Sequence, residues 1–476
     1  MENKLFLCLD QGGSSSRAII YNDSGQLLIK KQRLVAEFRS DDGLRVEQSP
    51  VELAGSLQRC AEDAFAELTS LERACNIEVA LISQRSSFVC VNTGSKEPVS
   101  PIVSWQDTRG REYVPASDSR RLHIYRLTGL MPNPHYSATK MQWYLQQEPA
   151  ISALAGQGEL KCLPLISFLL QQITGNDSYV VDRGSAARTL LLDAEKGEWS
   201  EELLEQFAIS ANYLPSLVNN YNNFGYLSIA GRQLPIKLIM GDQNAAYYAE
   251  GAPREDSVSI NVGTGAFLLT PMAEQRVANG LLKTMLRWQD KPYYALEATI
   301  NGASSAITGM AKALAIDEPI AVLEQQFANN TEPPLWINTW SGLASPYWRY
   351  DIASKFIDAE HSSVEQKLMA VCESVMFLIA VNYLQMKAVK PKLNRVMIGG
   401  GLSQLKGFCE SLSSVLGCEV ARPQVAESSS KGAAFLLSGR GKLWRKAPCD
   451  VFLPDNHAAV QRRFQRWHQH LQQYLV

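Results

Sequence analysis

Residues 5–21 read LFLCLDQGGSSSRAIIY, and this stretch decides the predicted fold. Its two apolar runs, residues 5–9 and 18–20, resemble β-strands, and a turn of glycine and serine separates them. Glycine in such a turn lets backbone amides approach a ligand closely, and successive N–H groups form a concavity that binds anions. The stretch therefore predicts a strand, a phosphate-binding turn and a second strand. A polar hairpin at the edge of a sheet has the same composition and is the alternative.

The side chains of this turn suit a phosphate group. Ser14, Ser15 and Ser16 supply hydroxyl donors, and Arg17 supplies a planar cation that can bond two phosphate oxygens at once. Asp10 lies where the first strand enters the turn, where an oxygen ligand could meet a Mg²⁺ ion that also touches phosphate. These residue types favour a phosphate site with its metal ion at the end of the first strand.

The length and composition of the chain indicate a globular protein of two large domains. It has 476 residues, 46% of them hydrophobic and 20% charged, and its net charge of -2 gives no overall attraction for nucleic acid or an anionic membrane. The nine cysteines are scattered singly without a CxxC pair, which favours reduced thiols over disulfides or a metal site. We see no secretory leader and no uncharged apolar run of the ~20 residues that span a bilayer. A cytoplasmic location is expected.

Several predicted strands end in polar residues. Residues 77–82 run into SQRSS, residues 102–105 into QDTR, and residues 235–240 into GDQN. Ligands of α/β sheets usually bind where strands end, so we expect these segments to meet at one site. The pattern from residue 119 to 170 is predicted helical, residues 364–386 form a long helix, and residues 428–430 cap a helix over residues 431–437.

The opening pattern of a strand, a glycine turn and a strand recurs once. Residues 257–269, SVSINVGTGAFLL, again read as a strand, a glycine turn and a strand, and the triple glycine at residues 399–401 follows another strand. The repeat predicts two related domains that each offer a phosphate-binding turn to one nucleotide, while the triple glycine allows close approach of the backbone to a ring or ribose. Two unrelated hairpins are the alternative. The chain has no GxxxxGK[ST], which excludes the P-loop class on motif grounds.

Nine motifs in order resemble the FGGY carbohydrate kinases, and within that family the glycerol kinase branch. They are LDQGGSSSRA, RVEQSP, SQRSS, SWQDTRG, HYSATKMQW, IMGDQNAAY, NVGTGAF, SGLASPYW and IGGGLS, and they run nearly from end to end of the chain. The resemblance implies an α/β fold of two actin-like, ribonuclease H-like ATPase domains with ATP in an interdomain cleft. We place the N-terminal domain at residues 1–243 and the C-terminal domain at residues 244–476.

The resemblance also implies the roles of the residues in these motifs. Asp242 would be the catalytic base, although it also precedes a helix and could cap it, and Asp10 would organise Mg²⁺ through water. The residues implied for ATP are Gly12, Gly13, Ser14, Ser15, Arg17, Gly263, Thr264, Gly265, Gly400, Gly401 and Ser403. Those implied for the substrate are Arg85, Ser86, Trp105, His135, Asp242, Gln243 and Phe267.

The chain departs from the family pattern at three of these positions. Glycerol kinase has a glutamate where this chain has Ser86 and a tyrosine where it has His135, and the family usually has a threonine where this chain has Gly13. A buried site that binds hydroxyls discriminates strongly through such groups. We therefore expect ATP-dependent phosphorylation of a polyol or sugar that is not glycerol and is longer. His135 could instead be an ordinary loop histidine.

Two other functions stay open at this stage. The WQDTR sequence also fits a pentulose kinase of the xylulose or ribulose type, and a catalytically weak sugar-binding sensor is compatible with Gly13 and with a degraded second family signature near residues 355–374. Retention of Asp10 and Asp242 argues against the sensor. The expected partner is a small polyol or sugar, with no nucleic acid and no membrane. We keep a homodimer open, because the sequence does not determine the oligomeric state.

Overall fold

The computed structural model describes residues 4–177, 179–272, 280–288, 291–329, 332–424, 427–439, 444, 448–455 and 458–475, without the side chains of residues 287, 288, 291 and 292. The chain divides into two compact units. The first comprises Met1–Ala252, Thr284–Tyr293 and Glu427–Lys446, and the second comprises Pro253–Lys283, Tyr294–Ala426 and Ala447–Val476. The predicted domain boundary at residues 243 and 244 stays a prediction.

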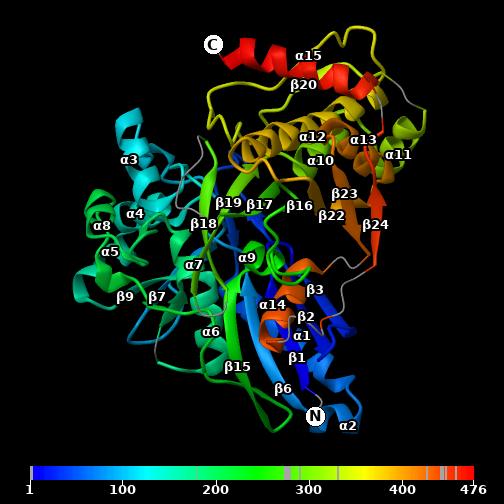
Figure 1. Cartoon of the computed structure of the whole chain (residues 1–476). Helices are drawn as coiled ribbons and strands as arrows, with labels where there is room; N and C mark the ends of the chain where they lie inside the picture. Colours follow the sequence, from blue (N-terminus) through cyan, green and yellow to red (C-terminus); the bar gives the residue numbers. More distant parts are fainter. Residues whose placement is uncertain are drawn as a thin grey trace. The chain divides into compact units, whose positions relative to one another are not determined.

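The first large sheet is built around the opening stretch. Its strands, in spatial order, are β14 (Tyr226–Ile229), β15 (Arg232–Gly241), β6 (Asn76–Ser83), β1 (Lys4–Gln11), β2 (Ser15–Asn22) and β3 (Leu27–Leu34). Strands β1, β2 and β3 form an antiparallel meander, and β6 is parallel to both β1 and β15. Figure 1 shows the three blue meander strands at one side of this sheet and the green β15 beyond β6. The strand, turn and strand predicted from residues 5–21 are therefore confirmed.

The second large sheet repeats this plan. Its order is β18 (Leu282–Trp288), β19 (Lys291–Ile300), β17 (Ala266–Met272), β16 (Ser257–Val262), β22 (Arg395–Gly400), β23 (Glu419–Pro423) and β24 (Cys449–Phe452). Strand β16 is antiparallel to β17 and parallel to β22, as β1 is antiparallel to β2 and parallel to β6. The matching pair orientations confirm that the predicted strand, turn and strand recur in the same arrangement.

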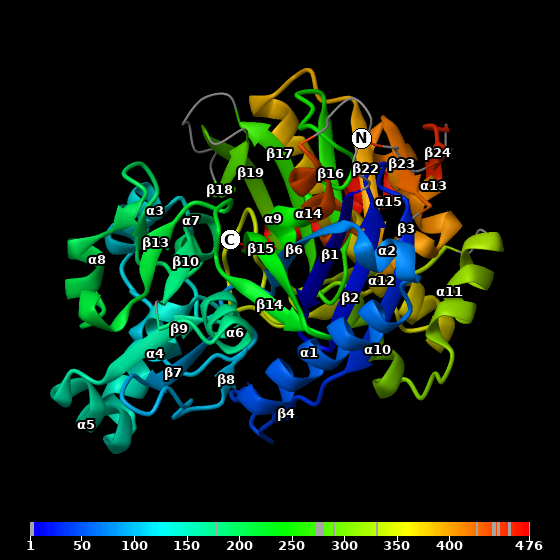
Figure 2. The same cartoon turned by 90° about the horizontal axis from the view of Figure 1, so that it is seen from below.

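Helices cover both faces of the first sheet. Alternate residues of a strand face opposite sides, so Cys8 and Asp10 share one face of β1. On that face lies α14 (Ser428–Ser438), to which the Cys8 thiol donates a hydrogen bond at the carbonyl of Ser430. Helices α1 (Pro50–Ala66) and α6 (Leu165–Thr174) pack on the strands as well, and Figure 2 shows α1 beside β2. Burial on both faces explains why β1 is a continuous apolar run rather than an alternating one.

A smaller five-stranded sheet completes the first unit. Its strands are β4 (Phe38–Arg39), β5 (Val46–Gln48), β8 (Ile102–Val103), β7 (Phe88–Asn92) and β9 (Leu160–Pro164). Around it lie α2 (Ser70–Ala74), α3 (Asp118–Thr128), α4 (Ser137–Gln147), α5 (Pro149–Gln157), α7 (Arg183–Ala187), α8 (Glu201–Gln206) and α9 (Asp242–Ala246), with short strands β10 (Val180–Asp182), β11 (Leu192–Asp193), β12 (Glu198–Trp199) and β13 (Ser216–Val218). The helical prediction for residues 119–170, broken only at MPNPHY (residues 131–136), was wrong at β9, because the short apolar run of β9 pairs with β7.

The second unit packs around one buried helix. Helix α12 (Val364–Val389) lies among α10 (Ser304–Ala313), α11 (Pro319–Ala328), α13 (Lys406–Leu416), α15 (Ala458–Leu475) and β20 (Leu335–Ile337). Strand β21 (Lys355–Ile357) pairs with β20. By length and composition α12 could cross a membrane, but 89% of its apolar window is buried inside the structure, as in the core helix of a soluble protein. Its Glu373 is buried with Arg463 of α15 as a bidentate ion pair, which satisfies both charges.

Helix α14 begins three residues earlier than predicted. Its N-cap is Glu427, and residues 428–430 are already helical, so the predicted cap was wrong. The Ser430 hydroxyl instead bonds the Glu427 carbonyl and the Tyr21 hydroxyl. The displaced start matters because α14 packs on α9, which carries Asp242 as its first residue.

Replacement of Gly432 tests this helix contact. A β-carbon at Gly432 would lie 1.9 Å from the carbonyl oxygen of Ala245 on α9. We expect Gly432→Ala to lower the free energy of unfolding by about 1–3 kcal/mol, since the helices must separate. The control is Gly156→Ala on the exposed side of α5, where a β-carbon meets nothing within 4 Å, and which should raise stability by about 0.5–1 kcal/mol. Equal denaturant unfolding curves for the two variants would contradict the contact.

Candidate active site

The register of the first sheet brings three strand ends together. Gln11 of β1 pairs with Ser83 of β6, and Ser83 pairs with Gly241 of β15. The residues that follow these strands therefore share one edge: the phosphate turn after β1, Gln84 to Ser86 after β6, and Asp242 after β15. The polar segments after β6 and β15, far apart in sequence, meet as expected from the strand-end pattern.

The phosphate turn is a tight, bonded loop. The Gly12 amide donates to the Ser15 carbonyl at 3.0 Å, and the Gln11 and Ser16 side chains bond each other on the opposite face of the sheet from Asp10. Asp10 and Arg17 are direct cross-strand partners, and a guanidinium nitrogen of Arg17 lies 3.6 Å from the Asp10 carboxylate. The turn thus offers a cation and backbone amides next to a buried carboxylate.

A residue that the sequence did not single out completes this charge cluster. Glu427, the N-cap of α14, lies 3.2 Å from the guanidinium of Arg17 and 2.5 Å from the ammonium of Lys30. The two cations thus neutralise Glu427, and Arg17 is shared between Glu427 and Asp10. A separation of 410 residues along the chain leaves no local signal for such a pair.

Burial sets the charge state of Asp10. The side chain is 2% exposed, and desolvation raises its pKa to about 6, with Arg17 opposing the rise and the negative charges of Asp242 and Glu427 adding to it. The electrostatic interaction with Asp242 indicates that both carboxylates belong to one site. A carboxyl with this pKa is mostly ionised at pH 7 and accepts a positive partner readily.

Asp242 opens helix α9. Its N-cap is Gly241, so the alternative in which Asp242 itself caps the helix was wrong. The amide of Gln243 donates to Asp242 Oδ1 at 2.7 Å, and the side chain stays 23% exposed, which leaves oxygen atoms accessible to a ligand. Burial raises the pKa of Asp242, while Arg85, whose Nε lies 3.9 Å from Oδ1, opposes that rise. A carboxylate held in this way can accept a proton.

Arg85 is locked in place beside Asp242. Its Nη1 donates to Asn244 Oδ1 at 3.0 Å, and the Asn244 amide nitrogen donates to the carbonyl of Met285. A β-carbon at Gly241 would lie 2.6 Å from Arg85 Cγ, so glycine is required there for the arginine to pack. Asn244 is a further residue that the sequence prediction left out, although it stands within the motif quoted for Asp242.

Ser86 turns its side chain toward the protein backbone. It has a φ of 64°, and its hydroxyl donates to the carbonyl of Arg188 at 3.1 Å. The Ser137 hydroxyl in turn donates to the carbonyl of Ser86. The loop after β6 is thereby tied to the start of α4 and to the segment after α7.

The side chains of Trp105 and His135 lie against each other, and we call this pair the Trp105–His135 wall. Their ring centroids are 5.9 Å apart, and His135 Nδ1 lies 3.1 Å from the Trp105 carbonyl oxygen. Burial lowers the pKa of His135 to about 4, and Lys140 adds to that effect, so the ring is neutral at pH 7. Because a carbonyl only accepts, Nδ1 carries the proton and Nε2 is left as an acceptor. Lys140, fully buried, donates to the carbonyls of Ser104 and His135 at 2.9 Å each and holds the wall together.

The second unit holds the remaining predicted residues. Val262 of β16 pairs with Gly400 of β22, so the turn at residues 263–265 and the triple glycine share one sheet edge. Gly400 has a φ of 92°, and a β-carbon there would lie 2.4 Å from the Val262 carbonyl oxygen, so only glycine fits. Gly401 follows with open space around it, and Phe267 lies on β17 opposite Thr299. The Ser403 hydroxyl bonds the Gly400 carbonyl at 2.6 Å and so supports the turn.

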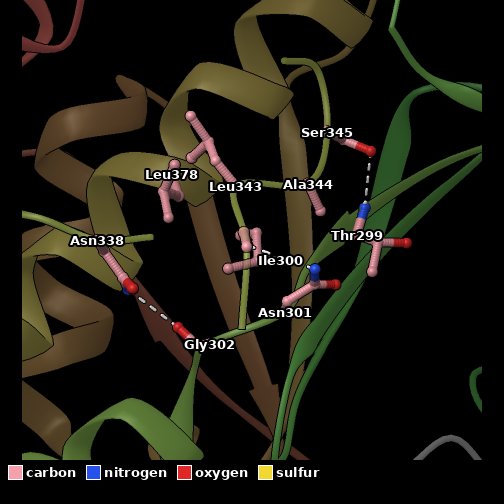
Figure 3. A pocket seen from close by; sticks show the side chains of 10 residues that line it. Thr299, Ile300, Asn301, Gly302, Asn338, Leu343, Ala344, Ser345 and Leu378 are labelled. Carbon is pink, nitrogen blue, oxygen red and sulfur yellow. Dashed lines mark hydrogen bonds between the residues drawn. The ribbon is translucent and has the colours of Figure 1, made fainter. Parts of the chain in front are cut away.

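The turn at residues 263–265 rests on a bonded loop. The amides of Ala303 and Ser304 donate to the carbonyls of Thr264 and Gly263, both at 3.1 Å. Figure 3 shows the segment just before that loop, where the Ser345 hydroxyl accepts from the Thr299 amide and Asn338 donates to the Gly302 carbonyl. The Gly263 amide donates to the Gly265 carbonyl at 2.8 Å, so the carbonyls of the turn are occupied and the amides of Thr264 and Gly265 are the candidates for an anion.

The carboxylates present fit a magnesium ion that is held mainly by phosphate. No cluster of three or more His, Cys, Asp or Glu side chains suited to a metal occurs among the residues that the structure describes. Magnesium typically keeps several waters and binds one or two carboxylates plus substrate phosphates. Asp10, beside the phosphate turn and close enough to Asp242 to affect its own pKa, matches that donor set.

Comparison with known proteins places these features in a family. The model described as "FGGY family of carbohydrate kinases, N-terminal domain" matches residues 5–247, and its C-terminal counterpart matches residues 258–438. A glycerol kinase of Rhodospirillum rubrum is 31% identical over 461 residues, which is 94% of this chain and 92% of that protein.

Solved structures show the same fold. The crystal structure of Plasmodium falciparum glycerol kinase with ADP has a TM-score of 0.86 and 22% identity, covering 100% of this chain and 99% of that chain. A ligand-bound xylulose kinase of Lactobacillus acidophilus has a TM-score of 0.84 and 17% identity, covering 99% of this chain and 98% of that one. These likenesses confirm the predicted class, a two-domain α/β fold of the actin-like ATPase type.

The raised pKa of Asp10 predicts a pH dependence of stability. In the folded protein Asp10 binds its proton up to about pH 6, whereas the unfolded chain releases it near the ordinary pKa of 3.8. The protonated group therefore contributes stability below about pH 4, and that contribution of about 2–3 kcal/mol is lost as the pH rises through about 6. We expect the unfolding free energy of Asp10→Asn, relative to wild type, to rise by this amount between pH 4 and pH 8. Urea unfolding without nucleotide measures it, and a difference that does not vary with pH would contradict it.

Proposed function

Since this chain belongs to the FGGY family of carbohydrate kinases, we propose that it uses ATP to phosphorylate a hydroxyl group of a small polyol or sugar. The observation that carries the proposal is the common edge of β1, β6 and β15, where Asp242, Arg85 and the phosphate turn lie after adjacent strands. A base for the acceptor hydroxyl and donors for the phosphates are the parts that phosphoryl transfer to an alcohol requires.

Asp242 is the proposed catalytic base. Its carboxylate is oriented by the Gln243 amide and remains partly exposed, so it can accept the proton of the attacking hydroxyl. Burial raises the pKa of Asp242, which strengthens it as a base, and the nearby Arg85 opposes that rise. Arg85 also supplies donors on the same side, which would orient the acceptor hydroxyl toward Asp242.

The nucleotide contacts are assigned to both units of the chain. In the first unit Arg17 and amides of the turn other than that of Gly12, which bonds the Ser15 carbonyl, would hold phosphate oxygens. In the second unit residues 263–265 would do so, with Gly400, Gly401 and Ser403 toward the adenosine. Mg²⁺, when bound, neutralises negative charge on the phosphates, and Asp10 is the residue that would hold it.

We also propose a cytoplasmic location, a homodimer and a domain division near residue 243.

Two residues support an acceptor longer than glycerol. Ser86 has a short side chain, and its hydroxyl donates to the Arg188 carbonyl. The volume that a longer side chain would fill at this position is therefore left for the substrate. His135 offers a neutral acceptor at Nε2 rather than a phenol. A ketose such as xylulose remains the second candidate, because a longer acceptor is what both substitutions favour.

Substitution of the base tests the chemistry. We expect Asp242→Asn to lower kcat by about 10²–10⁴-fold, because the amide cannot take the proton, while ATP still binds. The measurements are ADP release with the best acceptor and titration of ATP by calorimetry. The control is Asp63→Asn, which removes a carboxylate from the exposed pair with Arg33 and should leave kcat unchanged. Wild-type turnover in Asp242→Asn would contradict the assignment, and a wild type with no turnover on any acceptor would favour the sensor.

An acceptor panel tests the specificity. With glycerol, erythritol, ribitol, xylitol, D-ribulose and D-xylulose, we expect kcat/KM to be highest for an acceptor of more than three carbons. Because the pocket loses volume and gains hydrogen-bonding groups, the double variant Ser86→Glu with His135→Tyr should shift the ratio toward glycerol by about tenfold or more. Glycerol as the best substrate of the wild type by a wide margin would refute the longer acceptor.

A further inference from the structure

Two glutamine side chains, Gln48 and Gln84, support the phosphate turn, and the amide oxygen of Gln84 has no hydrogen-bond donor in the part of the chain that the structure describes. Gln48 Nε2 donates to the Gly13 carbonyl at 2.7 Å, and Gln84 Nε2 donates to Gln48 Oε1 at 3.0 Å. Within the described residues, the Oε1 atom of Gln84 is buried and has no hydrogen-bond partner. Gln84 itself is 4% exposed, so solvent does not supply the missing donor freely.

The bonds themselves determine which end of each amide faces the turn. The Gly13 carbonyl can only accept, so Gln48 must present its nitrogen to Gly13 and its oxygen to Gln84. That oxygen requires a donor, so Gln84 presents its nitrogen to Gln48 and its oxygen to the other side. Exchange of nitrogen and oxygen in either amide would break the chain of bonds, which makes the orphaned acceptor a consequence of the network.

The unused oxygen of Gln84 faces the small space that a β-carbon of residue 13 would occupy in close contact. A β-carbon at Gly13 would lie 3.2 Å from Gln84 Oε1, and beyond its own chain neighbours it would meet no other described atom within 4 Å. The φ of Gly13 is outside the left-handed region, so the conformation does not itself require glycine. The space lies between the phosphate turn and the loop that carries Arg85, because the Gln84 amide bonds the Gln11 carbonyl at 2.9 Å.

We propose that Gly13 and Gln84 form a subsite for an O–H donor that is not part of the chain, either a hydroxyl of the acceptor or a retained water molecule. The donor bonds Gln84 Oε1 and completes the network behind the phosphate turn. An unpaired buried acceptor is costly, and a hydroxyl is the smallest neutral group that satisfies it. Gln84 is thereby a positioning residue that connects the phosphate turn to the acceptor loop.

The test places a hydroxyl in the subsite covalently. In the ligand-free protein, Gly13→Thr should melt about 2 °C higher than Gly13→Val, which has the same shape without the hydroxyl. In a Gln84→Met background that difference should vanish, because the acceptor is gone. Equal melting of the Thr and Val variants, or a difference that persists in the Gln84→Met background, would overturn the proposal. The melting experiment needs no enzymatic turnover, so its outcome is independent of the proposed function.

Steady-state kinetics then shows whether the donor is an acceptor hydroxyl or a water molecule, and this second experiment rests on the proposed function. The KM values for ATP and for the acceptor are measured with whichever of glycerol, erythritol, ribitol and D-xylulose gives the highest kcat/KM. If the subsite takes an acceptor hydroxyl, Gly13→Thr raises the acceptor KM about fivefold relative to wild type, the value of one net hydrogen bond. If it retains water, the acceptor KM of Gly13→Thr and wild type agrees within about twofold and only the ATP KM changes. No change in either KM would contradict the subsite.

Discussion

The parallel pairing of β6 with both β1 and β15 is the constraint on which the candidate site depends. Gln11, Ser83 and Gly241 lie in register across these strands, so the residues after them are neighbours although they are far apart in the sequence. A shift of one residue in either pairing would turn every side chain of the strand to the other face. The buried apolar residues on both faces of β1 make such a shift costly, and core packing thereby determines where the carboxylates lie.

The second feature of the site is a pair of carboxylates that neighbouring arginines neutralise only in part. Burial raises the pKa of both Asp10 and Asp242, and a cation, Arg17 and Arg85 respectively, opposes that rise at each carboxylate. Glu427 then holds Arg17 from α14. Carboxylates that are costly to bury and incompletely neutralised accept a proton or a metal ion more readily than solvated ones, which is the property that phosphoryl transfer to an alcohol requires.

The residues proposed for the acceptor are arranged differently, around an uncharged histidine with a defined hydrogen-bonding direction. His135 is kept uncharged by burial, and its proton is assigned to Nδ1 by the Trp105 carbonyl. The Lys140 ammonium donates to the backbone carbonyls of Ser104 and His135, so it links these two segments through carbonyls rather than through a carboxylate. Burial lowers its pKa to about 7, so the bonds of this wall are made by a cation close to losing its proton.

The sequence by itself determined the strand–turn–strand units, their repetition, the two-domain α/β class and the motifs that carry Asp10, Arg85 and Asp242. These are local signals, because a glycine turn between apolar runs and a polar residue at a strand end are visible within ten residues. Only the tertiary structure decided that Glu427 faces Arg17, that Gln48 and Gln84 lie behind Gly13, and that residues 160–164 form a strand. Each of these depends on pairing between segments distant along the chain, and hydrogen-bond partners of that kind leave no periodicity in the sequence.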